Sequence, residues 1–243
     1  MENKKYKAII IGATGAVGRE LVDELLASPY YDLVTVYVRR KIDRWEHLSP
    51  EQQSKLQIHI VDNLDFLGNT KEELLTLTNN VKYDVLFNTL GSRVGRGEEE
   101  FRKVDYTYVV QSCEVCEKLN IQHYSNCSAM NADKTSWFLY SRVKGEAEEE
   151  MLKKNVPYIS IARPGIILNR DNDDRFGEKV VQWVPFIPKI SSKDIAKAML
   201  YDDLVFQRQP QTGSSTEKKG VRINNDELLT LVDKYNKENK KAF

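Results

Sequence analysis

The sequence has few cysteines and histidines, and neither residue type forms a set typical of a metal site. The three cysteines, Cys113, Cys116 and Cys127, fit a reducing compartment. Cys113 and Cys116 form a C-x-x-C pair, but they lie within a predicted helix and no second pair follows. This context favours small buried helix residues over a redox or metal role. The histidines show no ligand spacing, so we expect no metal site.

The sequence also lacks an excess of either charge and lacks a long hydrophobic run. Its 36 basic residues cancel its 36 acidic ones, which gives no general attraction to nucleic acid or to an anionic membrane. The apolar run near the N-terminus, AIIIGA, is far too short to span a bilayer, and no secretory signal is recognisable. We therefore expect a cytoplasmic location, with a nuclear or mitochondrial-associated one as the alternative, and neither a nucleic-acid partner nor a membrane span.

Short β-branched runs alternate with helical patterns through the first two-thirds of the chain. The predicted strands are 6–11, 32–38, 56–62, 83–91, 121–128 and 157–165, and the predicted helices are 19–28, 71–78, 98–120 and 136–155. This alternation predicts an α/β fold, a Rossmann-type doubly wound parallel sheet. We expect residues 1–243 to form a single domain, with a cofactor part of about 1–165 and a small C-terminal substrate-side extension of about 166–243. A final strand and helix are expected near the C-terminus, with Asn224 or Asn225 as the helix cap.

A glycine-rich turn joins the first predicted strand to the first predicted helix. Gly12, Gly15 and Gly18 form the pattern G-x-x-G-x-x-G in GATGAVG. Glycines permit a tight turn and let the backbone approach a pyrophosphate, which the free amides of the helix N-terminus then bind. An ordinary strand-to-helix turn rarely requires three glycines. The sequence thus predicts a dinucleotide site here, to which Thr14, Ala16 and Val17 would also contribute.

The second predicted strand ends in two arginines where NAD-binding folds carry an acidic residue. Guanidinium groups bind phosphate in a bidentate manner, so Arg39 and Arg40 favour the 2′-phosphate of NADP(H) over a bare ribose. A solvated basic turn is the alternative interpretation. Further cofactor contacts are predicted after the third and fourth strands: Asp62, Asn63, Leu90 and Gly91.

The segment FLYSRVKGEAEEE places Tyr140 and Lys144 four residues apart on a predicted helix, so both side chains share one face. Such a pair also arises by chance, since Tyr37 and Lys41 have the same spacing in a predicted strand, where they would lie too far apart to cooperate. A functional interpretation of Tyr140 and Lys144 therefore depends on their place after the fifth strand, downstream of the glycine turn. The acidic run 148–150 is predicted to be a solvated helix face.

Six segments together resemble a known family over residues 6 to about 177. They are GATGAVG, the RR pair after the second strand, LGS, EEFRKVDYTYV, NADKTSWFLYSRVKGEAE and ARPGIIL. The chain resembles an atypical short-chain dehydrogenase/reductase, and more closely the Tat-interacting-protein-like oxidoreductases. The resemblance implies that Tyr140 is the acid/base, that Lys144 is its partner and that Ser128, or else Ser125, supplies a hydroxyl. Arg163 and Pro164 would lie beside the nicotinamide.

Two positions depart from the family pattern. The frequent double serine is CSA here, which leaves one hydroxyl, and Asp105 stands where many relatives have Asn. The expected function is NADP(H)-dependent hydride transfer between nicotinamide and a small carbonyl or alcohol substrate, with Tyr140 transferring the proton. The alternative is an NADP(H)-binding regulator or complex subunit that acts through a protein partner. We expect a monomer or a homodimer. Trp183, Phe186 and Ile187 could line an apolar pocket, although core packing explains them better.

Overall fold

The computed structural model describes residues 4–168, 187–209 and 219–239. At its centre lies a sheet of seven strands, all parallel to their neighbours: β1 (Tyr6–Ile11), β2 (Tyr31–Val38), β3 (Leu56–Ile60), β4 (Val85–Asn88), β5 (His123–Cys127), β6 (Tyr158–Arg163) and β9 (Lys219–Asn224). The strand order is β3-β2-β1-β4-β5-β6-β9. The chain builds outward from β1 in one direction and then, from β4, in the other. This is the doubly wound order, so the predicted Rossmann-type sheet is confirmed.

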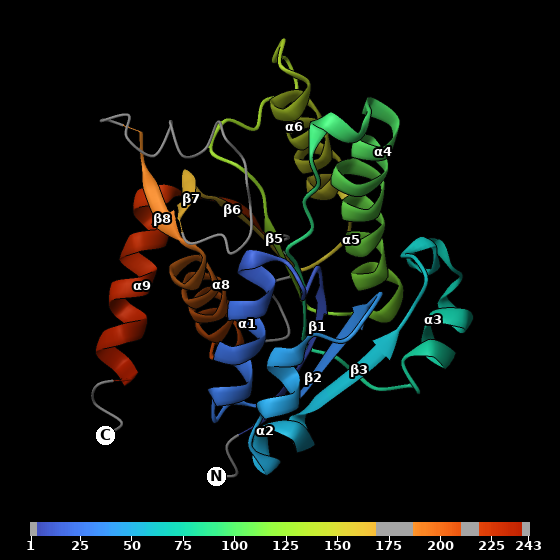
Figure 1. The fold of residues 1–243 in the computed structure, drawn as a ribbon, viewed down its shortest axis with the longest axis vertical. Coiled ribbons are helices and arrows are strands. Elements are labelled where there is room, and N and C mark those ends of the chain that lie inside the picture. The colour runs from blue at the N-terminus through green and yellow to red at the C-terminus, as the bar shows by residue number, and fades with distance from the viewer. Residues whose placement is uncertain (1–3, 169–186, 210–218, 240–243) are drawn as a thin grey trace.

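Helices cover both faces of this sheet (Figure 1). One face carries α1 (Ala16–Ala27), α8 (Ser192–Gln207) and α9 (Asn225–Asn239), and the other carries α3 (Lys71–Leu77), α5 (Tyr108–Leu119) and α6 (Leu139–Lys153). The predicted helix 98–120 consists of α4 (Glu98–Arg102), a π-helical turn η4 (Lys103–Thr107) and α5. Helices α1, α3, α5 and α6 therefore lie where the alternating sequence pattern predicts them.

The hydrophobic core has two halves, one on each face of the sheet. Because successive side chains of a strand point to opposite faces, β1 sends Ile10 toward α1 and α8 and sends Ile9 and Ile11 toward α5 and α6. All three isoleucines are buried. A strand buried on both faces has a continuous apolar sequence rather than an alternating one, which explains why β1 reads YKAIII.

Most of the described C-terminal third completes these layers. Strand β9 pairs with β6 as the seventh strand, and α8 packs between α1 and α9. Helix α9 begins at Asn225, and the backbone N–H of Asn224 donates to Glu227 (2.7 Å), as expected one residue before a helix start. Trp183 and Phe186 lie outside the described residues.

Four short elements were not predicted. Helix α2 (Pro50–Lys55) follows a 3-10 helix, η1 (Asp43–His47), and β7 (Ile166–Leu168) pairs with β8 (Lys189–Ser191) as a separate parallel ribbon. The sequence did carry a signal for α2. Ser49 and Gln52 form a reciprocal capping box, and Pro50 occupies the first helical position.

A buried polar network lies at the amino ends of the strands, opposite the glycine turn. His123, at the start of β5, has Nδ1 2.6 Å from Asp203 Oδ1 of α8 and Nε2 2.8 Å from Ser160 Oγ of β6. Tyr31, the first residue of β2, donates to the same Asp203. Burial raises the pKa of the Tyr31 phenol well above its ordinary value, and the Asp203 carboxylate raises it further. This network joins α8 to three strands and is almost closed to solvent.

Candidate active site

The glycine turn closes tightly around backbone atoms of the loop after β4. Gly12 has a φ of 89°, which favours glycine, and a Cβ on it would lie 2.7 Å from the Thr89 carbonyl carbon. A Cβ on Gly18 would lie 2.2 Å from the Gly12 carbonyl oxygen. Gly15 is the N-cap of α1 and no side chain caps this helix, so Thr14 and Gly15 present exposed backbone at its start. Ala16 and the buried Val17 form the first turn. This cradle fits a pyrophosphate.

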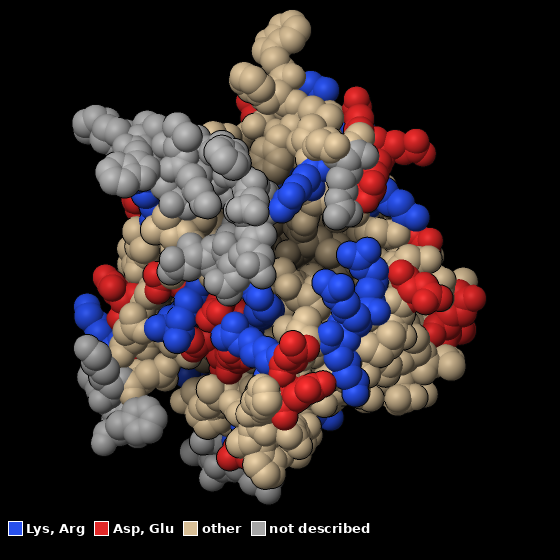
Figure 2. Space-filling model, in the orientation of Figure 1, with Lys and Arg blue, Asp and Glu red and all other residues tan. Residues whose placement is uncertain are grey.

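The predicted adenosine contacts lie on the loops that follow β2 and β3. Arg39 and Arg40 come directly after β2 and are exposed, and Asp62 and Asn63 follow β3 and are exposed as well. Parallel strands end at the same edge, so these four residues lie on the edge of the sheet that carries the glycine turn. Figure 2 shows the molecule in the orientation of Figure 1, and Lys and Arg side chains gather there beside a hollow near the centre of the view.

The loop after β4 is fixed at both ends. Asn88 Oδ1 accepts a hydrogen bond from the backbone N–H of Leu90 (3.1 Å). The backbone N–H and the hydroxyl of Ser92 both donate to Asp105 Oδ2, at 2.8 and 2.7 Å. Gly91 lies exposed between these two anchors. Leu90 and Gly91 therefore follow the end of the strand next to β1, beside the glycine turn, and their contact with a cofactor stays a prediction.

Tyr140 and Lys144 share one face of α6, as the sequence predicts. The Lys144 ammonium lies 5.6 Å from the centre of the Tyr140 ring and 3.0 Å from Asp105 Oδ1. Lys144 is buried, whereas Tyr140 is 40% exposed and its ring lies 6.0 Å from that of Phe101. Burial alone lowers the pKa of Lys144, but the Asp105 carboxylate and Tyr140 oppose it and raise the pKa above its ordinary value. The Lys144 ammonium thus lies beside an accessible phenol and is paired with a buried carboxylate.

Asp105 is a site residue whose importance the sequence did not show. It is 1% exposed and belongs to η4, the π-helical turn between α4 and α5. Turns of this kind are frequent at functional sites because they re-aim side chains. The sequence offered only the departure from Asn as a signal. The structure adds that this carboxylate contacts Lys144 directly.

Ser128, at the end of β5, donates its hydroxyl to Glu148 of α6 at 2.6 Å. Glu148 is 1% exposed, so the prediction of a solvated face over 148–150 is wrong for this residue. It also accepts from Arg163 Nε (3.0 Å) and Arg222 Nε (2.9 Å). The sequence missed this because an acidic run conceals which of its members turns toward the sheet. Ser125, the alternative hydroxyl, accepts a hydrogen bond from Ser160 Oγ (3.2 Å), which also contacts His123.

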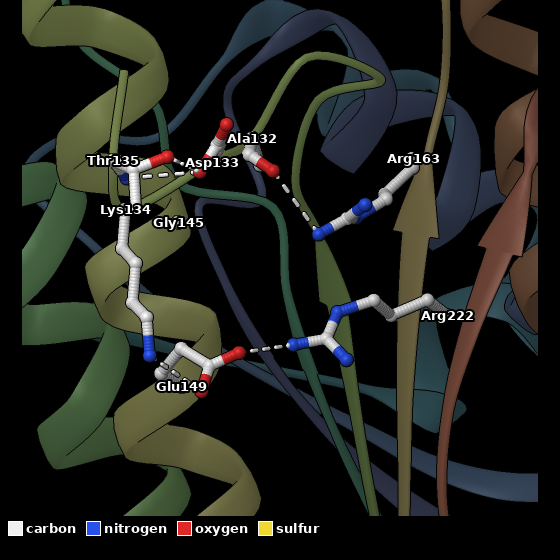
Figure 3. A pocket seen from close by; sticks show the side chains of 8 residues that line it. All are labelled: Ala132, Asp133, Lys134, Thr135, Gly145, Glu149, Arg163 and Arg222. Atoms are coloured by element: carbon white, nitrogen blue, oxygen red, sulfur yellow. Dashed lines mark hydrogen bonds and ion pairs between the residues drawn. The ribbon is translucent and has the colours of Figure 1, made fainter. Parts of the chain in front are cut away.

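A cavity of about 280 Å³ lies between α6, the loop 132–135 and the ends of β6 and β9 (Figure 3). Arg163 and Arg222 reach into it from the strands, and Lys134 and Glu149 close the side near α6. Each cation is matched by a carboxylate: Glu148 for Arg163, and Glu149 for Lys134 and Arg222.

Arg163 and Pro164, which were predicted to lie beside the nicotinamide, contact other residues of this chain. The Arg163 guanidinium donates to Glu148 and to the carbonyl of Ala132 (3.1 Å), and it lines the cavity beside α6. The Pro164 carbonyl accepts from the backbone N–H of Met130, which ties the segment after β6 to the loop after β5. A place beside the nicotinamide stays a prediction for both residues.

Other predicted features fall outside this site. Cys113 and Cys116 are fully buried in α5, as expected for helix packing. Within residues 4–168, 187–209 and 219–239, no three His, Cys, Asp or Glu side chains group as metal ligands would. The helices in these ranges include none with the length and apolar character needed to cross a bilayer. Ile187, the described member of the suggested apolar pocket, is partly buried.

Comparison with known proteins agrees with this geometry. A family model described as NAD(P)H-binding matches residues 12–201. Rat protein HTATIP2 is 32% identical over 181 residues, which cover 73% of this chain and 69% of that protein. The Candida albicans protein named "Protein FMP52, mitochondrial" is 26% identical over 240 residues, which cover 93% of this chain and 98% of that protein.

Solved structures share the fold. ElxO with NADP bound superposes with a TM-score of 0.61 at 16% identity, covering 93% of this chain and 99% of that one. MoeE5 in complex with UDP-glucose and NAD gives 0.62 at 12% identity, covering 94% and 81%. At such identities the likeness concerns the fold alone. The family model spans most of the chain and the rat relative shares nearly a third of the aligned residues, so this chain belongs to the NAD(P)H-binding family, as an atypical short-chain dehydrogenase/reductase that resembles HTATIP2.

Proposed function

We propose that this protein is an NADP(H)-dependent oxidoreductase that interconverts a small carbonyl compound and its alcohol. The observation that carries the proposal is the pair formed by the buried Lys144 ammonium and the accessible Tyr140 phenol. The glycine turn, into which a Cβ on Gly12 or Gly18 would intrude, supports a dinucleotide at the same edge of the sheet.

In this proposal, the chain binds, orients and protonates. A bound nicotinamide supplies or accepts the hydride. Tyr140 donates its phenol proton to the substrate oxygen during reduction and takes a proton back during oxidation, while the Lys144 ammonium stabilises the phenolate that forms. The single hydroxyl proton of Ser128 is already used in a hydrogen bond to Glu148. We therefore assign proton transfer to Tyr140 and assign Ser128 a supporting contact with the substrate oxygen, which requires exchange of that hydrogen bond.

The test is oxidation of NADPH in the presence of a panel of aldehydes and ketones, followed at 340 nm. We expect turnover with at least one carbonyl class, and we expect Tyr140→Phe to lower kcat at least about a hundredfold, the lower range for loss of a general acid. Tyr106→Phe, on the neighbouring η4, is the matched control. Turnover that survives Tyr140→Phe would refute the mechanism.

The preference for NADP(H) over NAD(H) rests on Arg39 and Arg40, which are exposed at the end of β2. Replacement of both by Ala should weaken NADPH binding at least about tenfold, because two charge-assisted contacts to the 2′-phosphate are lost. NADH affinity should stay unchanged. An equal loss for both cofactors would show that the arginines do not read the 2′-phosphate.

A second candidate function is an NADP(H)-binding regulator that acts through a protein partner. Trp137 and Phe138 favour it, because they are 96% and 78% exposed at the start of α6, next to Tyr140. Arg142 Nη1 donates to the carbonyls of Ser136 and Trp137 (3.0 and 3.2 Å) and so holds this turn outward. Aromatic side chains, Trp above all, are enriched at many protein interfaces. Pull-down of the wild type and of Trp137→Ser/Phe138→Ser, with and without NADPH, tests this function, and identical partner sets would count against it.

For the location, the balanced composition favours the cytoplasm, whereas the name of the Candida albicans relative places that protein in mitochondria. We propose the cytoplasm with a mitochondrial association as the alternative. Cell fractionation against matrix and cytosolic markers distinguishes the two.

A further inference from the structure

One buried carboxylate connects two separate parts of the site. Asp105 Oδ2 accepts from the backbone N–H and the hydroxyl of Ser92, and Asp105 Oδ1 lies 3.0 Å from the Lys144 ammonium. Ser92 belongs to the loop after β4, whereas Lys144 belongs to α6, far along the chain. The π-helical turn η4 places Asp105 between the two. Movement of this loop and movement of Lys144 are therefore mechanically linked.

The same contact decides the charge of Lys144. A buried ammonium without a partner loses its proton readily, since burial disfavours the charged form. The titratable groups that act on Lys144 are Asp105 from η4, Tyr140 from its own helix and Cys127 from the end of β5. Asp105 lies closer to the ammonium than Tyr140 does: its Oδ1 forms an ion pair with it at 3.0 Å, whereas the centre of the Tyr140 ring is 5.6 Å away.

We propose that Asp105 is a positioning residue that pairs with Lys144 and tethers it to the loop after β4. Cofactor binding would then act on this loop and on Lys144 together. The proposal rests on the proposed function, because it assigns Lys144 a role beside the cofactor. The carboxylate carries a negative charge that an amide at this position would lack.

Asp105→Asn separates the two roles of the carboxylate. An Asn side chain still has an oxygen that accepts from Ser92, but it lacks the charge that holds the proton on Lys144. The buried Lys144 of this variant should therefore lose its proton within the range from pH 7 to 10. We expect NADPH affinity, measured by fluorescence titration, to fall about tenfold more over this range than it does in the wild type.

Ser92→Ala is the matched control, because it removes the hydroxyl hydrogen bond to Asp105 and leaves the ion pair between Asp105 and Lys144 in place. Its pH profile should run parallel to that of the wild type, with a uniform change in affinity only. A parallel profile for Asp105→Asn as well would overturn the proposal. Circular dichroism and the urea midpoint at pH 7 confirm that each variant is folded.

A second measurement needs no cofactor and distinguishes failure of this proposal from failure of the proposed function. The urea midpoints of Asp105→Asn, Lys144→Met and the double variant form a double-mutant cycle. The double variant should unfold at a higher urea concentration than the sum of the single shifts predicts, since each single variant leaves one buried charge without its opposite charge. Additive shifts overturn the proposal. If the wild type fails to bind NADPH, the proposed function fails, and the cycle alone decides whether Asp105 holds Lys144.

Discussion

Replacement of Glu148 by Gln tests the buried charge cluster behind Ser128. The Glu148 carboxylate, 1% exposed, accepts from Ser128 and from two arginines. Loss of one partner of a buried ion pair costs about 3–5 kcal/mol, because the remaining charge is left without compensation. Here the arginines keep some exposure, 20% for Arg163 and 34% for Arg222, so water relieves part of the penalty. We expect a loss of about 2–3 kcal/mol.

For a domain of this size, such a loss lowers Tm by about 5–10 °C. Thermal and urea unfolding measure it directly. Glu149→Gln is the matched control, since Glu149 also contacts Arg222 but is 42% exposed and should contribute at most about 1 kcal/mol. Equal destabilisation by the two substitutions would refute the reasoning, because it would mean that burial does not decide the strength of these pairs.

Two further predictions concern the glycine turn and the buried Tyr31. Gly18→Ala should weaken NADPH binding at least about tenfold, because the new Cβ would lie 2.2 Å from the Gly12 carbonyl oxygen and must displace the turn. The control is Gly95→Ala, which should bind NADPH normally because a Cβ at this position meets nothing within 4 Å. Normal NADPH titration by both variants would contradict the prediction. Burial raises the pKa of Tyr31, so above pH 10 the unfolded chain ionises this phenol while the folded chain keeps its proton, and stability should fall by up to about 1.4 kcal/mol per pH unit. Urea midpoints from pH 8 to 11 should therefore decline less steeply in Tyr31→Phe than in the wild type, and identical slopes would count against the assignment.

The sequence predicted the sheet and the cofactor edge because both depend on local signals. Apolar runs such as YKAIII, the three glycines and the Tyr140–Lys144 spacing each report on a few neighbouring residues. Helix α2 also had a local signal, the capping box of Ser49 and Gln52, which is easily overlooked in a short segment.

The charge pairs could not be predicted in this way. Asp105 and Lys144 lie 39 residues apart in the numbering, and Arg222 lies 74 residues after Glu148. Nothing in EAEEE distinguishes Glu148 from Glu149 until α6 is placed on the sheet, where the first turns inward and the second toward solvent. Which ionic side chains pair with one another is decided only when the helices have packed against the sheet.

The contacts of His123 with Asp203 and Ser160 reproduce the hydrogen-bond order of the serine hydrolases, with a carboxylate on Nδ1 and a hydroxyl on Nε2. Ser160 is 1% exposed and His123 is wholly enclosed, so an ester or amide has no path to the oxygen nucleophile unless the protein unfolds. A search for catalytic triads by interatomic distance alone would thus misassign this protein as an esterase. Access to the nucleophile has to be part of any such criterion.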